Sequence, residues 1–519
     1  MAASESTPLL ANKATEPPAA IARSSGLFPP FRRLLLVSLL LSVAFVSTAT
    51  PLLYQMKVMS ERVCEEWEAC SARQASKLAA QNISLMVTLT TLSGILNLFS
   101  TGWLMRRYGP RFAMVMQTLV PCLRNVAQTC AVLDGGILGI RLLQWTQLMT
   151  IFGGGAGYML TANTFVNALV TPEERTASFG ILQGVFMFGS MVGFSIGGLV
   201  GDRFGDAAPF EVTLSLLIIS TILSSAFLPY IAPEPVDEKG GTGIGSMLKP
   251  LLVLGPRRTE KEEGGDGKRY WGVPLLTFGT AMGVFASAYV PMMLQMVATN
   301  EFGFGVKKNG YMMSLTSASR GAFLTLLFPR IIALGRRLYT NPKASPPPTP
   351  SEPSGPLPTT PADFEPLSAL PEAPAEEPTP PPKPTDADHG SHFDLAFLRS
   401  SLVVDALLTA GASFISEGWH IYAAALILPL ASGTAPAAKG VLLELVPAAQ
   451  QSEALAGIAL VETIAMTLTV SVFGLVFAYL SEIGQPFLVF DLNAAVALLA
   501  AIILAFVRFP RVIKGAGDV

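Results

Sequence analysis

Long apolar blocks constrain this chain more than any other feature of its sequence. Many of them reach the roughly 20 residues that a helix needs to cross a lipid bilayer. Charged residues make up only 14% of the chain, whereas soluble proteins carry about 25%. Because the bilayer core offers no hydrogen-bond partner to a free backbone amide, such blocks can cross it only as helices. The sequence therefore predicts an all-α polytopic membrane protein with about twelve transmembrane helices.

The predicted spans fall into two halves with related junctions. We expect spans at about residues 34–56, 80–104, 112–133, 137–170, 177–200 and 210–231, and then at about 271–297, 310–334, 400–416, 422–446, 454–480 and 486–507. The fourth span closes with Pro172-Glu-Glu-Arg175, and the tenth closes similarly with Pro447 to Glu453. Weak repetition between two halves is typical of transporters that rock one half against the other. The halves are expected at residues 32–231 and 271–507, with a central cytosolic loop at 232–270.

Basic residues indicate which loops face the cytosol. Arg106, Arg107 and Arg111 share the short loop after the second span, which assigns that loop to the cytosolic side. The polar tail at residues 1–31 lacks the pattern of a signal peptide and is expected to be disordered and cytosolic. The basic C-terminal tail, residues 508–519, is assigned to the same side.

Two loops carry features of their own. Residues 341–388 hold seventeen prolines between Pro342 and Pro384, so we expect a disordered cytosolic loop there. It would act as a plain linker or as a ligand for a proline-binding domain, and the sequence leaves both open. Cys64 and Cys70 lie in the first outer loop, where oxidising conditions would allow a disulfide between them.

Several charged residues lie inside the apolar spans. They are Arg124, Arg141, Arg320, Asp405, Lys439, Glu462 and Asp491. A charge at a helix centre costs about 2.5–3.5 kcal/mol on insertion scales, so such residues usually face the protein interior and have partners. Asp405 and Glu462 are the carboxylates best placed to carry a proton. A static ion pair with Arg320 or Lys439 is the alternative for each of them.

The other intramembrane charges receive different expectations. Arg124 is expected to have a structural partner, and Asp491 lies near the outer end of its span, as an interface residue would. Gln144 would bond either a substrate or a neighbouring helix. Glu174 and Arg175, in the loop after the fourth span, are expected to form a gate pair at the cytosolic surface.

Glycines in the fifth span predict close helix packing. Gly189, Gly193 and Gly197 recur at intervals of four, and Gly198 follows directly. Small residues on one helical face let a neighbouring backbone approach closely.

These motifs together resemble the major facilitator superfamily. Gly102, Arg107, Gly109 and Arg111 are similar to its G-x-x-x-D-R-x-G-R-R signature, with Arg106 in place of the aspartate and Pro110 in place of one arginine. Arg141-Leu-Leu-Gln144 is similar to its R-x-x-Q-G element, with Trp145 in place of the glycine. The glycine run from Gly189 to Gly198 resembles the G-x-x-x-G-P-x-x-G-G element of proton-coupled drug exporters, with Phe194 in place of the proline. The chain also looks similar to fungal members related to folate and tetracycline transporters.

The resemblance covers nearly the whole chain and implies a transporter that works by alternating access. It implies a role for Arg141 in proton coupling or in holding an anionic group, and a cytosolic gate around the signature loop. We expect proton-driven export of a small organic molecule, a metabolite or a toxic compound. Proton-coupled uptake of an organic anion or nutrient is the alternative. A receptor or scaffold that transports nothing is a second alternative.

Other classes of function find no support in the sequence. There is no Gly-x-x-x-x-Gly-Lys-Ser/Thr phosphate loop for ATP-driven transport, and no catalytic constellation of an enzyme. The three histidines form no metal-binding pattern. We expect no cofactor, no metal and no nucleic-acid partner. The partners expected are a small-molecule substrate, protons and the lipid bilayer, with the protein a monomer in the plasma membrane rather than the vacuolar membrane.

Overall fold

The structure is a computed structural model, and it is helical throughout nearly all of its described residues. These are residues 29–65, 72–231, 250–258, 269–288, 290–304, 306–339, 387–447 and 450–509. The predicted tails and most of the predicted loops at 232–270 and 341–388 lie outside the described residues, so those predictions remain predictions. The all-α fold class is confirmed.

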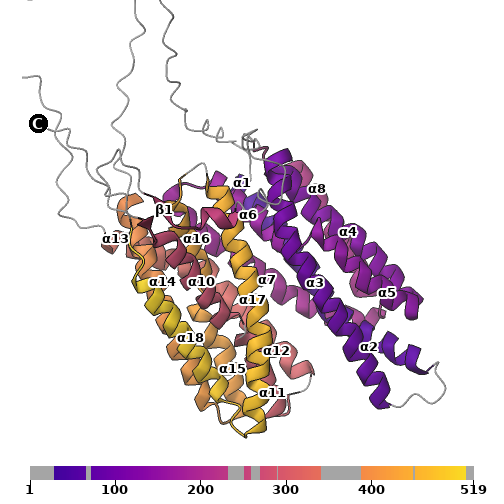
Figure 1. The fold of residues 1–519 in the computed structure, drawn as a ribbon. Coiled ribbons are helices and arrows are strands. Elements are labelled where there is room, and N and C mark those ends of the chain that lie inside the picture. Colours follow the sequence, from indigo (N-terminus) through magenta and orange to yellow (C-terminus); the bar gives the residue numbers. More distant parts are fainter. Residues whose placement is uncertain are drawn as a thin grey trace, which may run out of the picture. The chain divides into compact units, whose positions relative to one another are not determined.

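The chain forms two compact units, which are coloured by sequence in Figure 1. The first unit comprises Met1–Thr171 and Val192–Gly240, and the second comprises Pro172–Met191 and Gly241–Val519. One long helix, α7 (Pro172–Phe204), contributes its first part to the second unit and the rest to the first unit. The predicted halves at 32–231 and 271–507 remain predictions, and the two units are described separately below.

The first unit is built from long helices that pack along their lengths. Its elements besides α7 are α1 (Pro30–Ser47), α2 (Ala49–Glu65), α3 (Ala72–Tyr108), α4 (Pro110–Asp134), α5 (Ile137–Trp145), the 3₁₀ helix η1 (Thr146–Ile151), α6 (Gly155–Leu169) and α8 (Ala208–Phe227). Proline occupies the first position of α4, where its missing N–H costs nothing. The preceding Gly109 has φ 88°, a left-handed conformation that favours glycine, so a tight turn joins α3 to α4.

The fourth predicted span is broken rather than continuous. Phe152, Gly153 and Gly154 separate η1 from α6. Side chains of α3 and α4 bond the backbone that the break leaves free. Asn97 Nδ2 donates to Ile151 O at 3.3 Å, and Gln117 Oε1 accepts from Gly154 N at 2.8 Å. The break is therefore held by buried amides.

The second unit holds the remaining helices and one short pair of strands. These are β1 (Arg257–Arg258), β2 (Arg269–Tyr270), α10 (Gly272–Ser287), α11 (Val290–Asn300), α12 (Val306–Ala322), the π-helical turn η3 (Phe323–Leu327), α13 (Phe328–Tyr339), α14 (Ala387–Gly411), η5 (Ala412–Phe414), α15 (Gly418–Ile427), η6 (Leu428–Ala431), α16 (Thr434–Leu445), α17 (Gln451–Glu482) and α18 (Leu488–Ala505). The strands pair antiparallel, with Arg257 opposite Tyr270. The main apolar core lies among α10, α13, α14, α16, α17 and α18.

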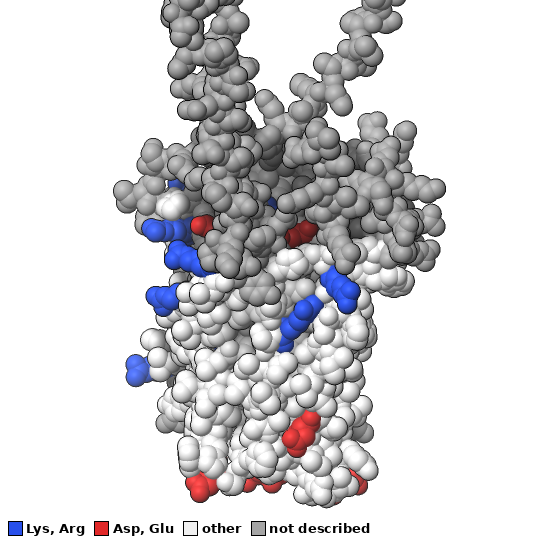
Figure 2. Space-filling view, turned by 90° about the vertical axis from the view of Figure 1, so that its left-hand side faces the viewer, with Lys and Arg blue, Asp and Glu red and all other residues white. Residues whose placement is uncertain are grey.

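The helices overlap the predicted membrane spans, although the first apolar stretch runs from Pro30 to Ser47 rather than over residues 34–56. In the described part of the chain, ten stretches are long and apolar enough to cross a membrane. Helix α4 and the broken α5–η1–α6 stretch occupy the positions of the third and fourth predicted spans. The ninth span differs, because its apolar stretch begins at His392 rather than near residue 400. On the face drawn in Figure 2, uncharged residues form a broad surface, with Lys and Arg gathered toward one end and most Asp and Glu at the other.

Candidate functional site

A buried ion pair joins α16 to α17 in the second unit. Lys439 Nζ lies 3.2 Å from Glu462 Oε2, and both side chains are largely buried, at 10% and 14% exposure. Glu462 Oε1 has no hydrogen-bond partner in the described part of the chain. The pair therefore balances one charge of each sign inside two predicted spans, and it leaves one carboxylate oxygen available to a proton.

A second pair of opposite charges lies between α12 and α14 in the same unit. Asp405 is buried and interacts electrostatically with Arg320, although no direct bond between them is recorded. Asp405 Oδ2 and Arg320 Nε both lack hydrogen-bond partners among the described residues. Since the ninth span begins at His392, Asp405 lies deeper in its span than the sequence predicted.

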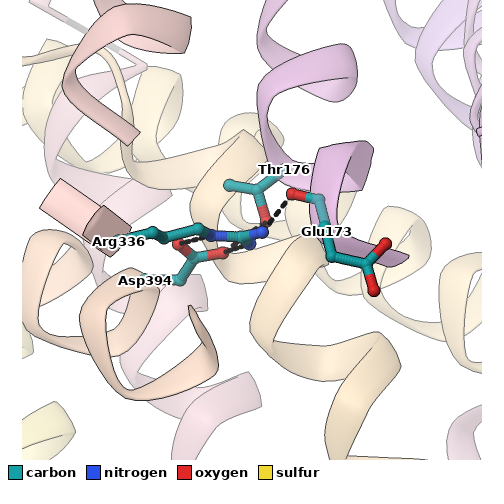
Figure 3. A network of polar contacts seen from close by, with 4 residues as sticks. All are labelled: Glu173, Thr176, Arg336 and Asp394. Atoms are coloured by element: carbon teal, nitrogen blue, oxygen red, sulfur yellow. Dashed lines mark hydrogen bonds and ion pairs between the residues drawn. The ribbon is translucent and has the colours of Figure 1, made fainter. Parts of the chain in front are cut away.

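A polar network at the start of α7 is the strongest charge cluster of the second unit (Figure 3). The Arg336 guanidinium pairs with Asp394, with Nε donating to Oδ1 at 3.0 Å. Thr176 donates its hydroxyl to Asp394 Oδ2 at 2.5 Å, and Arg336 NH1 donates to the Glu173 carbonyl oxygen. Asp394 is almost completely buried, with 1% of its side chain exposed. One arginine therefore ties α13 and α14 to the first turn of α7.

The sequence analysis missed both members of this ion pair. A signal was present, because Arg336 and Arg337 end α13 as Arg106 and Arg107 end α3. The repeat points to the arginine, but the position of its partner Asp394, 58 residues away, depends on how the helices pack.

The predicted gate residues do not form one cluster in the structure. In the first unit, Arg111 donates to the Ser225 carbonyl near the end of α8, where a cation suits the helix dipole. Arg106 is half-buried, Arg107 is exposed, and Gly102 is buried in α3. In the second unit, Glu174 is exposed, and Arg175 interacts electrostatically with Glu444 and Glu173.

Arg141 and Gln144 of the fourth span have different environments. Arg141 is exposed, and no bond to it is recorded within the described residues. Gln144 is buried and donates through Nε2 to Asn82 Oδ1 at 3.2 Å. Asn82 in turn donates through Nδ2 to Ser60 Oγ at 3.0 Å. Gln144 therefore links α5 to α3 and α2.

The fifth-span glycines approach neighbouring helices closely. A Cβ added at Gly193 would lie 2.8 Å from Val43 O in α1, and one at Gly197 would collide with Ser47 O. Gly189 is buried in α7, and Gly198 follows Gly197. Asp491 lies half-buried in the first turn of α18, near the end of that span.

The predicted disulfide has one described member. Cys64 is buried and disulfide-bonded. Cys70 lies outside the described residues, so the pairing of these two cysteines remains a prediction.

The sequence matches the family model described as Major Facilitator Superfamily over residues 35–341, more than half of the chain. The chain belongs to the major facilitator superfamily. This family consists of membrane transporters and not enzymes, so the protein is a secondary transporter embedded in a membrane by multiple spans.

Curated relatives match parts of the chain. The Aspergillus fumigatus major facilitator superfamily multidrug transporter mfsC is 28% identical over 192 residues, which is 35% of this chain and 35% of mfsC. The chain thus matches about a third of the length of this relative. The major facilitator-type transporter psiT1 of Psilocybe cyanescens is 20% identical over 365 residues, 62% of this chain and 74% of that protein.

Solved structures share the fold over most of the chain. The human organic anion transporter MFSD10 matches with a TM-score of 0.61 at 13% identity, over 92% of this chain and 100% of that one. The Escherichia coli fucose:proton symporter matches with a TM-score of 0.61 at 12% identity, over 92% of this chain and 98% of that one. At these identities the likeness confirms the fold alone.

Proposed function

We propose that this transporter couples the export of a small organic molecule to the movement of protons. The observation that carries the proposal is the buried Lys439–Glu462 ion pair. Ionisable residues within spans are costly and commonly mark ion pathways. The proposed site of action is the plasma membrane, with the vacuolar membrane as the alternative.

The chemistry of the pair supports proton coupling. While Glu462 is ionised, Lys439 has a counter-ion and the pair is neutral as a whole. Protonation of Glu462 removes that counter-ion. An uncompensated charge costs about 3–5 kcal/mol when it is fully buried, and less here because both side chains retain some exposure. The protonated state therefore favours a rearrangement of α16 against α17, or entry of another anion beside Lys439. Either response links proton binding to a change in the pathway.

The Arg336–Asp394 pair supports a role for α7 in the conformational cycle. This helix belongs to the second unit at its start and to the first unit beyond Met191. Alternating access by relative movement of the units would bend α7 or release its first turn from Arg336. The bonds from Arg336 to Asp394 and to the Glu173 carbonyl would then oppose that release.

Export is the proposed direction, for two reasons. The glycine run of the fifth span resembles that of proton-coupled exporters, and the partial relative mfsC is named a multidrug transporter. Uptake of an organic anion is the second candidate, and the exposed Arg141 favours it because this cation has no bonded carboxylate among the described residues.

Proton coupling is tested with the full chain in liposomes under an imposed pH gradient. The probes are ethidium, a cation, and 1-naphthoate, an aromatic carboxylate, with a pH-sensitive dye in the lumen. We expect Glu462→Gln to abolish probe flux driven by the gradient. The matched control is Glu482→Gln, which alters an exposed glutamate at the end of the same helix and should leave flux unchanged. Gradient-driven flux that persists in Glu462→Gln would contradict the proposal, and the direction of flux separates export from uptake.

A further inference from the structure

Arg124 lies near the middle of α4, far from either end of this helix. Its side chain is partly exposed. Arg124 NH1 donates to Thr150 Oγ1 at 2.6 Å. A guanidinium carries five N–H donors in a fixed planar fork. Arg124 Nε is buried and has no partner in the described part of the chain. The Thr150 hydroxyl therefore accepts only one of the hydrogen bonds that the Arg124 guanidinium can donate.

No carboxylate is positioned to neutralise Arg124 within the first unit. The sequence contains no Asp or Glu from residue 72 to 133, or from 135 to 171. The acidic residues of this unit with described side chains lie at or near helix ends: Glu61, Glu65, Asp134, Asp206 and Glu211. Asp134 is already bonded, because its Oδ2 accepts from the backbone N–H groups of Gly136 and Gly139. The positive charge of Arg124 thus lacks a counter-ion among the unit's described side chains.

The backbone beside Thr150, the residue that Arg124 bonds, is held in position by hydrogen bonds. Thr150 lies in η1, directly before the break in the fourth span. The backbone at the break is held from both sides, since Asn97 bonds Ile151 O and Gln117 bonds Phe152 O. These amides are fully buried. The Thr150 hydroxyl is therefore preorganised, which lowers the entropic cost of holding the Arg124 guanidinium in place for a ligand.

We propose that Arg124 and Thr150 form a subsite for an anionic group of the transported molecule, a carboxylate or a sulfonate. The planar fork of arginine matches the geometry of such groups and binds them through two parallel hydrogen bonds. The bound anion supplies the negative charge that Arg124 lacks. Substrate binding therefore offsets the free-energy cost of an arginine within an apolar span. This inference rests on the proposed transport function and defines its substrate class as organic anions.

The test uses binding rather than flux, on the purified full chain in detergent. The probes are 1-naphthoate, 1-naphthalenesulfonate and the neutral 1-naphthamide, and the readout is the concentration dependence of the thermal unfolding midpoint. We expect both anions, but not the amide, to stabilise the protein. Arg124→Gln should weaken anion binding by about tenfold or more, because it removes a charge-assisted contact. Arg124→Lys keeps the positive charge but loses the planar guanidinium. Its affinity for the anions should therefore lie between those of the wild type and of Arg124→Gln.

The hydroxyl of Thr150 provides a second variant with a matched control. Thr150→Val is expected to weaken anion binding by about two- to fivefold, since a neutral hydrogen bond contributes less than a charged one. Thr118→Val changes another buried threonine, whose hydroxyl bonds only carbonyls of its own helix, and should leave binding unchanged. A merely structural Thr150 would lower the midpoint of the ligand-free protein without changing the apparent affinity for the anions.

The outcomes separate this proposal from the proposed function. Anions that fail to stabilise the wild type, or that stabilise Arg124→Gln equally, would overturn the subsite. Anion binding that depends on Arg124, in a protein that Glu462→Gln leaves fully proton-coupled, would instead support the subsite and refute the proposed coupling residue.

Discussion

Three cations of the second unit and two of the first unit differ in their partners. In the second unit, Arg336 bonds Asp394, Lys439 bonds Glu462, and Arg320 interacts with Asp405. In the first unit, no carboxylate is paired with Arg124 or Arg141 among the described residues. Both units contain positively charged side chains within apolar spans, where a charge is energetically unfavourable. The difference lies in the distribution of acids, which the first unit keeps near the ends of its helices.

This contrast suggests a division of labour. An ion pair has no net charge while its carboxylate is ionised. It becomes positively charged when that carboxylate binds a proton. A cation without a carboxylate partner keeps its positive charge until an anion binds beside it. Under the functions proposed above, the second unit would couple protons and the first would hold an anionic substrate. Substitutions that change the pairing in either unit test this comparison.

The largest effect is expected at the start of α7. Asp394→Ala would leave Arg336 charged and without its main partner, and breaking a buried pair costs about 3–5 kcal/mol. Thr176 would lose its acceptor as well. We expect the variant to unfold at lower temperature in detergent and to lose transport. Arg330→Gln, which removes an exposed charge from the same helix as Arg336, is the control and should change neither property.

The double variant Arg336→Met with Asp394→Leu tests whether the unpaired charge causes this loss of stability. Replacing both partners by apolar residues removes the unpaired charge, so much of the stability should return. Transport should remain impaired if the pair also holds α7. A double variant that is no more stable than Asp394→Ala alone would show that charge pairing is not what this network contributes.

The Lys439–Glu462 pair is expected to show a smaller loss of stability, because both side chains retain some exposure. Lys439→Met leaves Glu462 without its cation, at a cost of about 2–3 kcal/mol for a partly exposed pair. The exchange of the two residues, Lys439→Glu with Glu462→Lys, should recover folding but not coupling. Thermal unfolding and gradient-driven flux measure the two properties separately. Equal loss of stability in the single and exchanged variants would exclude a direct pair.

Some of this arrangement could be read from the sequence, and some could not. Hydropathy located the spans because lipid imposes a minimum helix length. The charged residues were also identifiable, since each one interrupts an apolar run. The choice between a static pair and a proton carrier for Glu462 depends on its distance from Lys439, which lies on another helix. The Arg336–Asp394 pair was missed because the proline-rich segment separates its members in the chain. The start of the ninth span was missed for a related reason, since it follows directly on that segment.

A further test concerns the packing that brings α7 against α1 in the first unit. Gly197→Ala would drive a Cβ into the Ser47 carbonyl, a backbone group that cannot move aside easily. Overpacking of this kind typically costs about 1–3 kcal/mol. Gly201→Ala is the matched control on the same helix, because its Cβ would meet Pro209 Cγ at an ordinary 3.5 Å. A fall in unfolding temperature for both variants alike would indicate that helix packing is not the cause.

The smallest effect is expected at Asn82, where neutral polar groups of the first unit bond one another, whereas Arg124 and Arg141 have no paired carboxylate among the described residues. Asn82→Leu removes the bonds to Ser60 and Gln144, and interhelical hydrogen bonds in membranes average about 0.6 kcal/mol. Asn82 is also the first residue of an Asn-Ile-Ser glycosylation sequon. Ser84→Ala destroys this sequon but keeps the asparagine and therefore the two bonds that Asn82→Leu removes. Equal effects of the two substitutions would assign the role of Asn82 to a glycan, whereas an effect of Asn82→Leu alone would show that the bonds to Ser60 and Gln144 stabilise the first unit.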